Sequence, residues 1–208
     1  MKYSELLRIV GREAVFRSSL LAAAAPDPVD LGRQLSRWRK SGRLIQLRRG
    51  VYALSERYRK NDPHPFTAAN LMQSASYVSL QSALEYHGLI PEYVPAVTSV
   101  TTGRPEQLDN PLGSFIYRHI QKALFFGYRR LDLGQGQSAF VAEPEKALLD
   151  LLYLTPGLGD SAYLRELRLQ NLASLNMDRL KDMTAQANVP KLLAACPRIA
   201  ELREEDRT

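Results

Sequence analysis

Two prolines, Pro63 and Pro65, lie two residues apart and exclude a continuous helix through this part of the chain. The balance of charge changes sign at the same place. Residues 1–60 contain 14 Lys and Arg against 5 Asp and Glu, whereas residues 61–208 contain 14 against 17. Because 208 residues can build two small domains, we predict one domain over residues 1–60, called the head, and another over residues 66–208, called the body.

The head has the pattern of three helices followed by a β-hairpin. The predicted helices cover residues 4–10, 16–25 and 28–41, and the predicted strands cover residues 44–47 and 51–54. Ser4 is the expected N-cap of the first helix, and Pro26 is expected to stop the second. Asp27 and Pro28 suit the N-cap and first position of the third helix, and the basic turn Arg48-Arg49-Gly50 joins the two strands. This order of elements is typical of a winged helix-turn-helix.

The body is predicted to be mixed α/β with a helical tail. Helices are expected at residues 66–73, 79–87 and 145–154, and strands at residues 97–102, 113–120 and 138–141. Residues 124–128 are expected to form a strand or extended segment. Residues 160–203 are expected to be predominantly helical, with interruptions near Pro190 and Pro197. The predicted fold class is therefore α+β, with an N-terminal winged helix-turn-helix, a mixed α/β C-terminal domain and C-terminal helices.

The third predicted helix has two opposite faces. At about 100° per residue, Leu31, Leu35 and Trp38 fall on one apolar stripe. Three cations fall on the opposite side at the same spacing, and these are Arg33, Arg37 and Lys40. Like charges at this spacing repel one another, so helix stability alone does not favour them. DNA phosphates reverse that cost, because each neutralised phosphate releases condensed counterions.

We therefore predict that the head binds double-stranded DNA. The candidate contacts, which lie between residues 31 and 55, are Arg33, Gln34, Arg37, Arg39, Lys40, Arg43, Arg48 and Arg49. The candidates for base edges are Arg33, Gln34 and Arg37, since they are nearest the start of the helix and arginine bonds guanine in the major groove. Phosphates or a minor groove are the expected contacts of Lys40, Arg43, Arg48 and Arg49. Arg39 is expected on the flank of the helix. Two alternatives stay open: a solvated basic face, or a surface that grips an acidic protein or RNA.

One cluster in the body carries residue types that serve acid–base chemistry. It comprises Glu143, Glu145, Lys146 and Asp150 around one predicted helix start. The simpler interpretation is structural, because carboxylates beside Pro144 suit the positive end of a helix. A hydrolase or transferase that uses this cluster is the alternative.

The sequence contains no recognisable metal or nucleotide motif. Its three histidines and one cysteine, Cys196, have no metal-ligand spacing, and His87 is expected to cap the end of its own helix. The G-x-G fragments at residues 134–136 and 157–159 lack a third glycine, and no Walker-type motif occurs. We therefore expect no enzyme activity, no cofactor and no metal.

The sequence shows neither a membrane-spanning segment nor a secretory signal, and this constrains the expected localisation. No window approaches the roughly 18 consecutive apolar residues that span a membrane. The first 15 residues are interrupted by charges and lack the apolar core of a secretory signal. A single cysteine forms no intrachain disulfide. The expected compartment is the cytoplasm, with no membrane partner.

The body also carries a series of distinctive segments. They are SASYVSLQSALEYHGLIPE (74–92), VTSVTTGRP (97–105), GSFIYRHI (113–120), LFFGY (124–128) and AEPEKALLDLLYL (142–154). In this order they resemble the AbiEi-type antitoxins of type IV toxin–antitoxin (abortive infection) systems. The resemblance covers roughly residues 6–154, and GVYAL (50–54) is similar to the second strand of the family's wing.

The resemblance implies a prokaryotic antitoxin that is also a transcriptional autorepressor and not an enzyme. Its head would bind inverted repeats in its own promoter, and its body would neutralise a nucleotidyltransferase-type toxin without requiring a stable complex. Since the sequence shows no heptad seam, we expect monomers that cooperate on repeated half-sites. The alternative is a winged-helix interaction protein or transcription factor unrelated to a toxin, whose body binds a partner or ligand.

Overall fold

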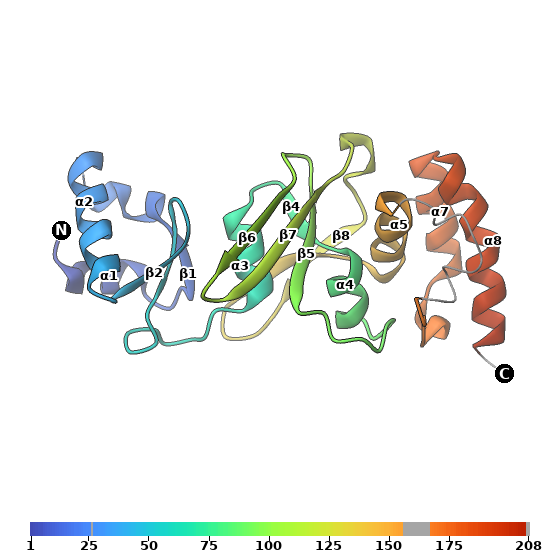
Figure 1. Ribbon diagram of the computed structural model, residues 1–208, viewed down its shortest axis with the longest axis horizontal. Coiled ribbons are helices and arrows are strands. Elements are labelled where there is room, and N and C mark those ends of the chain that lie inside the picture. Colours follow the sequence, from blue (N-terminus) through green and yellow to red (C-terminus); the bar gives the residue numbers. More distant parts are fainter. Residues whose placement is uncertain (26, 156–166, 207–208) are drawn as a thin grey trace.

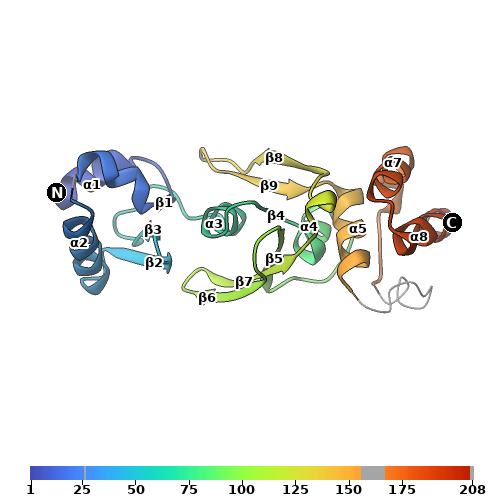
Figure 2. The ribbon, with the colours of Figure 1, turned by 90° about the horizontal axis from the view of Figure 1, so that it is seen from above.

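The computed structural model describes residues 1–25, 27–155 and 167–206. The molecule is elongated, and the head, a central sheet and the C-terminal helices follow one another from the N-terminal end to the C-terminal end (Figure 1). The view from above has the same order (Figure 2). None of the helices in the described ranges combines the length and apolarity needed to cross a bilayer.

The head is a winged helix-turn-helix, as predicted. Its elements are α1 (Tyr3–Val10), β1 (Val15–Arg17), the 3₁₀ helix η1 (Ser18–Ala24), α2 (Pro28–Lys40), β2 (Leu44–Arg48) and β3 (Val51–Leu54). The strands form an antiparallel sheet in the order β1-β3-β2, which we call the wing sheet. The predicted hairpin is therefore present, and a third strand from an earlier part of the chain extends it.

Two details of the head differ from the prediction. The segment expected to be helical from Phe16 begins as strand β1, because Val15 and Phe16 pair with β3 and point into different hydrophobic clusters. Only the residues after β1 are helical, as η1, and Pro26 lies outside the described residues. Helix α1 begins before Ser4, with Lys2 as the N-cap, so the expectation that Ser4 caps this helix was wrong.

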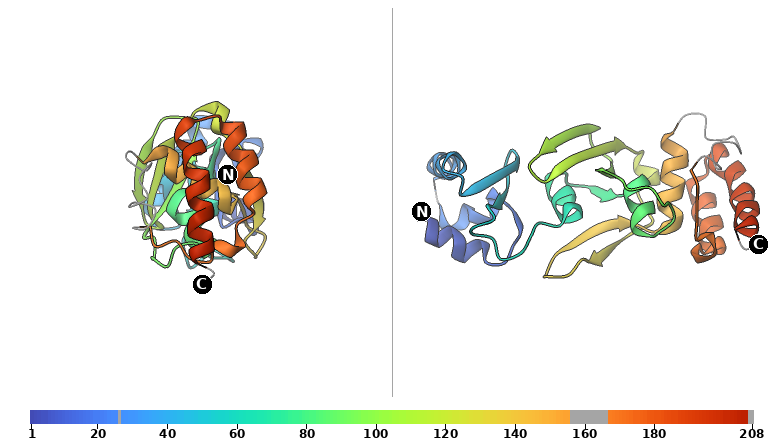
Figure 3. Two further views of the ribbon diagram at one scale, coloured as in Figure 1. Left: turned by 90° about the vertical axis from the view of Figure 1, so that its right-hand side faces the viewer. Right: turned by 60° about the horizontal axis from the view of Figure 1, so that its bottom comes forward.

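The body consists of a six-stranded mixed sheet with helices. Its elements are α3 (Pro65–Met72), β4 (Ser76–Val78), α4 (Leu80–Tyr86), β5 (Ala96–Thr101), β6 (Glu106–Asn110), β7 (Gly113–His119), η2 (Lys122–Leu124), β8 (Tyr128–Asp132), β9 (Ser138–Ala142), α5 (Pro144–Leu154), η3 (Leu172–Ser174), α7 (Met177–Ala187) and α8 (Pro190–Glu205). The strand order is β6-β7-β5-β4-β9-β8. Strand β5 is parallel to β7 and β4 is parallel to β9, whereas the other pairs are antiparallel. Helices α7 and α8 cover the C-terminal end of the molecule (Figure 3, left).

The helices predicted at residues 66–73, 79–87 and 145–154 and the strands predicted at residues 97–102, 113–120 and 138–141 are present to within about two residues. Of the segment expected to be helical, residues 160–166 lie outside the described residues, and the described remainder contains α7 and α8, with the expected interruption before Pro190. Three strands were missed, because β4 has only three residues and β6 and β8 are polar edge strands without an apolar alternation. Residues 124–128, expected to form a strand or extended segment, instead contain the end of η2 and a left-handed Gly127 (φ +72°), and β8 begins at Tyr128. Helix α8 continues through Pro197, so the predicted interruption there was wrong, at the cost of one backbone hydrogen bond.

The wing sheet is buried on both of its faces. In β3, Val51 and Ala53 belong to the hydrophobic core of the body, whereas Tyr52 and Leu54 belong to the separate core of the head. Figure 3 (right) shows the wing sheet between the head helices and the body. The alternation of a strand thus lets one sheet close two cores.

Polar contacts also join the head to the body. The Arg17 guanidinium donates to the carbonyl oxygen of Leu71 at the end of α3 (2.9 Å). The Asn61 side chain donates to the carbonyl oxygen of Gln135, in the β8–β9 connection (3.1 Å). The residues between the head and α3 form no helix or strand. The head is therefore held on the body by packing and by side-chain hydrogen bonds, not by the connecting segment alone.

A buried ion pair lies inside the body. Lys146 and Asp150, one turn apart on α5, form a salt bridge, and both side chains are almost inaccessible to solvent. The Asp150 carboxylate also accepts hydrogen bonds from Tyr77 Oη (3.0 Å) and Ser79 Oγ (2.7 Å). Burial raises the pKa of Asp150 and lowers that of Lys146, and the attraction between the two opposes both shifts. A Cβ at position 127 would lie 3.0 Å from the Lys146 side chain, so glycine leaves room for the lysine there.

Replacing Lys146 with Met is expected to lower the free energy of unfolding by about 3–5 kcal/mol, because it leaves a buried carboxylate without its counter-charge. Urea denaturation measures this loss. The double variant Lys146→Met/Asp150→Asn removes both charges, keeps acceptor oxygen for Tyr77 and Ser79, and should recover most of it. Lys122→Met, at an exposed position, is the control and should change stability by less than about 0.5 kcal/mol. A Lys146→Met protein as stable as the parent would contradict the assigned role of the pair.

Candidate nucleic-acid interface

Helix α2 has the local signals of a well-defined start and end. The Asp27 carboxylate accepts a hydrogen bond from the backbone N–H of Val29 (2.8 Å), and Pro28 occupies the first helical position, as predicted. After the helix, Gly42 adopts a left-handed conformation (φ +69°), which turns the chain into β2. The helix lies at the end of the head that is remote from the body (Figure 1).

The apolar stripe of α2 faces the core of the head. Leu31, Leu35 and Trp38 are at most 9% exposed. They belong to the same hydrophobic cluster as Leu6 of α1 and Phe16 of β1. This packing confirms the predicted inner face and determines which side of the helix faces solvent.

The opposite stripe of α2 is exposed and basic. Arg33, Arg37 and Lys40, which we call the basic stripe, are all exposed. No hydrogen bond or ion pair joins their side chains to any residue that the structure describes. The basic stripe therefore leaves its full charge and all its side-chain donors available to a ligand. Its role in DNA binding stays a prediction.

Arg43, just beyond the helix, is oriented by an aromatic cluster. Its guanidinium lies over the Tyr3 ring, 5.1 Å from the centroid, and Tyr3 Oη donates to the Arg43 carbonyl oxygen (3.1 Å). The Tyr3 ring packs edge-on against Trp38 and Tyr58. Burial, with a smaller effect of Tyr58, raises the pKa of Tyr3 to about 12, so its phenol remains a protonated donor at neutral pH.

Sequence reasoning missed the two tyrosines of this cluster. Tyr3 and Tyr58 stand at opposite ends of the head sequence, and neither follows the periodicity of a neighbouring element. Their effect is to hold Arg43 beside the basic stripe without neutralising it.

Two of the predicted contacts are already engaged within the head. The Arg39 guanidinium donates to Gln46 Oε1 (2.8 Å) and thereby ties α2 to β2. The Gln34 amide donates to the Asp30 carboxylate (2.6 Å). Arg39 is on the flank of α2, as predicted, and contributes to the position of the helix relative to the wing sheet.

The two arginines of the hairpin point to different surroundings. The Arg48 guanidinium donates to the carbonyl oxygen of Met72 (3.0 Å) and to Gln73 Oε1 (2.6 Å), and it forms an ion pair with Glu106 (2.8 Å). Arg49 is exposed and forms no side-chain contact with the described residues. The structure therefore places Arg49 with the unpaired cations, whereas Arg48 joins the head to the body.

The acidic cluster of the body has structural partners. The Glu145 carboxylate accepts a hydrogen bond from the Asn176 backbone N–H (2.7 Å), and Glu143 forms an ion pair with Arg179 of α7 (2.5 Å). These contacts fasten α5 to the C-terminal helices. The residues of the cluster therefore maintain the packing of α5, in agreement with the simpler interpretation of the sequence.

The side chains of His87 and His64 also bond to the backbone. His87 is the C-cap residue of α4, as expected, and its backbone N–H donates to the carbonyl oxygen of Ala83 (3.0 Å). Its imidazole, however, bonds outside the helix, since Nε2 lies 2.8 Å from the carbonyl oxygen of Ala142 in β9. His64 Nδ1 accepts from the Phe66 N–H and caps α3. No group of three or more potential metal ligands occurs among the residues that the structure describes.

The comparisons with known proteins agree with this architecture. Residues 5–55 match the family described as "Transcriptional regulator, AbiEi antitoxin". The head is an AbiEi antitoxin domain. That family is one of transcriptional regulators and not of enzymes, and the matched residues include α2 and the wing hairpin.

The fold of the whole chain is similar to a crystal structure of the Rv2827c protein from Mycobacterium tuberculosis. The two chains are 16% identical, the TM-score is 0.55, and the match covers 99% of this chain and 80% of the other. At this identity the likeness is one of fold. No curated protein matches the chain significantly.

Replacing Arg48 with Ala is expected to lower the free energy of unfolding by about 1–3 kcal/mol, because the Glu106 carboxylate and two acceptors lose a charged donor. The matched control is Arg49→Ala, which removes the same side chain one residue later and should change stability by less than about 0.5 kcal/mol. Chemical denaturation of both variants measures the difference. Equal stabilities would show that Arg48 does not hold the head on the body.

Proposed function

We propose that the protein is a cytoplasmic, DNA-binding antitoxin that represses its own operon and counteracts a nucleotidyltransferase-type toxin of a type IV toxin–antitoxin system. In this proposal residues 1–60 bind DNA and residues 66–208 provide the antitoxin function. The observation that carries the DNA-binding part is the basic stripe, whose three cations are exposed and unpaired within the described residues. The match of residues 5–55 to the AbiEi regulators supports the same reading.

In the proposed complex, α2 enters the major groove with its basic stripe toward the bases. Repulsion between Arg33, Arg37 and Lys40 is relieved when phosphates and base acceptors replace water around them. Arg33 and Arg37 are assigned to base edges, where a bidentate contact to guanine discriminates between base pairs. Lys40 and Arg43 flank them and are assigned to phosphates, together with Arg49 of the wing hairpin.

Gln34 can contact DNA only after its side chain leaves its partner within the head. Its amide is bonded to Asp30, and its Oε1 atom is buried with no hydrogen-bond partner among the described residues. Contact with a base edge requires that Gln34 leave Asp30. We therefore assign the main readout to the arginines and not to Gln34.

Arg39 and Arg48 act indirectly in this proposal. Arg39 holds α2 against β2, and Arg48 holds the hairpin against the body through Glu106. Each head presents one reading helix, so inverted repeats are read by two copies of the chain that cooperate as monomers on DNA.

The proposed antitoxin role rests on the AbiEi description and on the size of the body outside the matched residues. The body packs independently of the basic stripe, since α2 lies at the remote end of the head (Figure 1). We therefore assign the two activities to separate surfaces. Antagonism of the toxin does not require a stable complex in this scheme.

The DNA proposal is tested with a duplex from upstream of the protein's own reading frame, by fluorescence anisotropy over a range of salt concentrations. If each of the five assigned cations neutralises one phosphate, the slope of log K against log salt is about −4.5. These cations are Arg33, Arg37, Lys40, Arg43 and Arg49. Arg33→Ala/Arg37→Ala should weaken binding about 100-fold or more and abolish the preference over a scrambled duplex. Lys40→Ala/Arg49→Ala should weaken binding to both duplexes alike and reduce the slope by about two.

The control variant is Arg104→Ala, which loses one arginine from an exposed position of the body. It should bind as the parent does. Specific binding that survives in Arg33→Ala/Arg37→Ala would refute the assignment of α2, and competition by structured RNA as effective as duplex DNA would favour an RNA-binding head.

The antitoxin proposal is tested in cells that carry the neighbouring gene, provided that this gene encodes a nucleotidyltransferase-like protein. Co-expression of the full chain should restore growth. The Arg33→Ala/Arg37→Ala chain, expressed from a foreign promoter, should restore growth equally well while failing to repress a reporter joined to its own promoter. Growth arrest that neither chain relieves would remove the antitoxin role and leave the DNA-binding role standing.

A further inference from the structure

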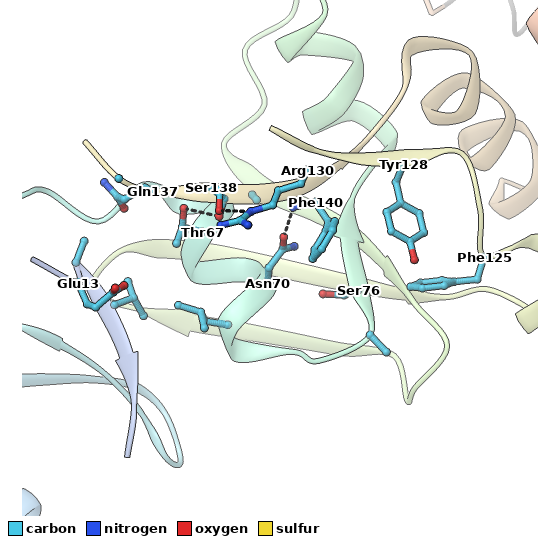
Figure 4. Close-up of a pocket in the computed structure, with 16 residues that line it drawn as sticks. Glu13, Thr67, Asn70, Ser76, Phe125, Tyr128, Arg130, Gln137, Ser138 and Phe140 are labelled. Atoms are coloured by element: carbon cyan, nitrogen blue, oxygen red, sulfur yellow. Dashed lines mark hydrogen bonds between the residues drawn. The ribbon is translucent and has the colours of Figure 1, made fainter. Parts of the chain in front are cut away.

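A cavity of about 550 Å³ lies where the head meets the body. Its walls come from α3, from the β8–β9 hairpin and from the start of β1 (Figure 4). Glu13 of the head lies at one end, whereas Phe125 and Tyr128 of the body lie at the other. The cavity is thus large enough for a small organic molecule and opens between two parts of the chain.

Aromatic side chains form the body end of this cavity. The Tyr128 ring lies 5.1 Å from the Phe125 ring and 5.8 Å from the Phe140 ring, measured between centroids. Phe140 is 45% exposed, so part of its ring is accessible to a ligand. Rings at such angles present both faces and edges to a further ring, so this end of the cavity suits a planar aromatic group.

Beside the rings, Asn70 of α3 has an unsatisfied donor. Its Oδ1 atom accepts a hydrogen bond from the backbone N–H of Phe140 (2.5 Å), which fixes the orientation of the amide. Its Nδ2 atom is buried and has no hydrogen-bond partner among the described residues. A buried donor without an acceptor is unfavourable, so the site favours a ligand that brings an acceptor.

Arg130 of β8 supplies a positive charge to the same cavity. Its Nε atom donates to Ser138 Oγ (2.8 Å), which holds the guanidinium along β9. No ion pair joins Arg130 to an acidic residue in the described part of the chain. Four of its five N–H donors are therefore left for an anion, and a carboxylate matches their planar geometry.

We propose that this cavity binds a small aromatic carboxylic acid. The ring lies against Phe125, Tyr128 and Phe140, and the carboxylate accepts hydrogen bonds from Asn70 Nδ2 and the Arg130 guanidinium. The site is independent of the basic stripe, so its test does not depend on whether the chain binds DNA.

Isothermal titration calorimetry of the full chain with benzoate, phenylacetate and indole-3-acetate tests the proposal. At least one of these acids should bind, whereas acetate, which lacks a ring, should not. The corresponding amides keep the ring but not the charge, and should bind about tenfold more weakly or worse.

Two variants distinguish the assigned contacts from a structural effect. Asn70→Asp keeps the oxygen that accepts from Phe140 N–H but replaces the free donor with negative charge, and Arg130→Gln removes the cation. Each should weaken binding of the best acid about tenfold or more. The matched control is Arg129→Gln, since Arg129 points to the other face of β8 and does not line the cavity. It should bind like the parent.

Three results would overturn the proposal. These are the absence of binding by all three acids to the folded protein, amides that bind as tightly as the acids, and parental affinity in both Asn70→Asp and Arg130→Gln. Circular dichroism of each variant confirms that it is folded, and either variant alone is sufficient for the test if the other does not fold.

Discussion

Strand β3 contributes alternate side chains to two hydrophobic cores, and the arrangement of the whole molecule depends on this double burial. One face of the wing sheet closes the core of the head, and the other face packs on the body. Helix α2 then lies at the end of the head that is remote from the body. A wing that was solvated on one face would leave the hairpin arginines free, but here Arg48 faces the body.

Charge pairing separates the cations of the head into two groups. Arg48 and Arg39 have acceptors within the chain, so their contribution is to hold elements together. The basic stripe and Arg49 have none among the described residues, so their charge is directed outward. The same principle applies inside the body, where Lys146 and Asp150 neutralise one another in a region from which water is excluded.

Much of the head could be predicted from the sequence because its signals are local. The N-cap of α2, the apolar stripe and the glycine after it all lie within 16 residues of chain, and they specify one helix and its inner face. Less of the body could be predicted from the sequence, because β4, β6 and β8 are stabilised by the strands that neighbour them and have no clear hydrophobic pattern of their own. For the same reason Phe16 was assigned to a helix, although it pairs with Tyr52 in β3.

The sequence by itself determined the winged helix-turn-helix, the position of the basic excess and the absence of any catalytic motif, since each depends on residue types at short spacing. Only the tertiary structure decided which cations are free. Glu106 is remote in sequence from Arg48, and no pattern in either segment indicates that they meet. The cavity at the junction is likewise built from three separate segments of chain. Contacts between distant residues arise from the packing of complete elements, and a local pattern carries no information about them.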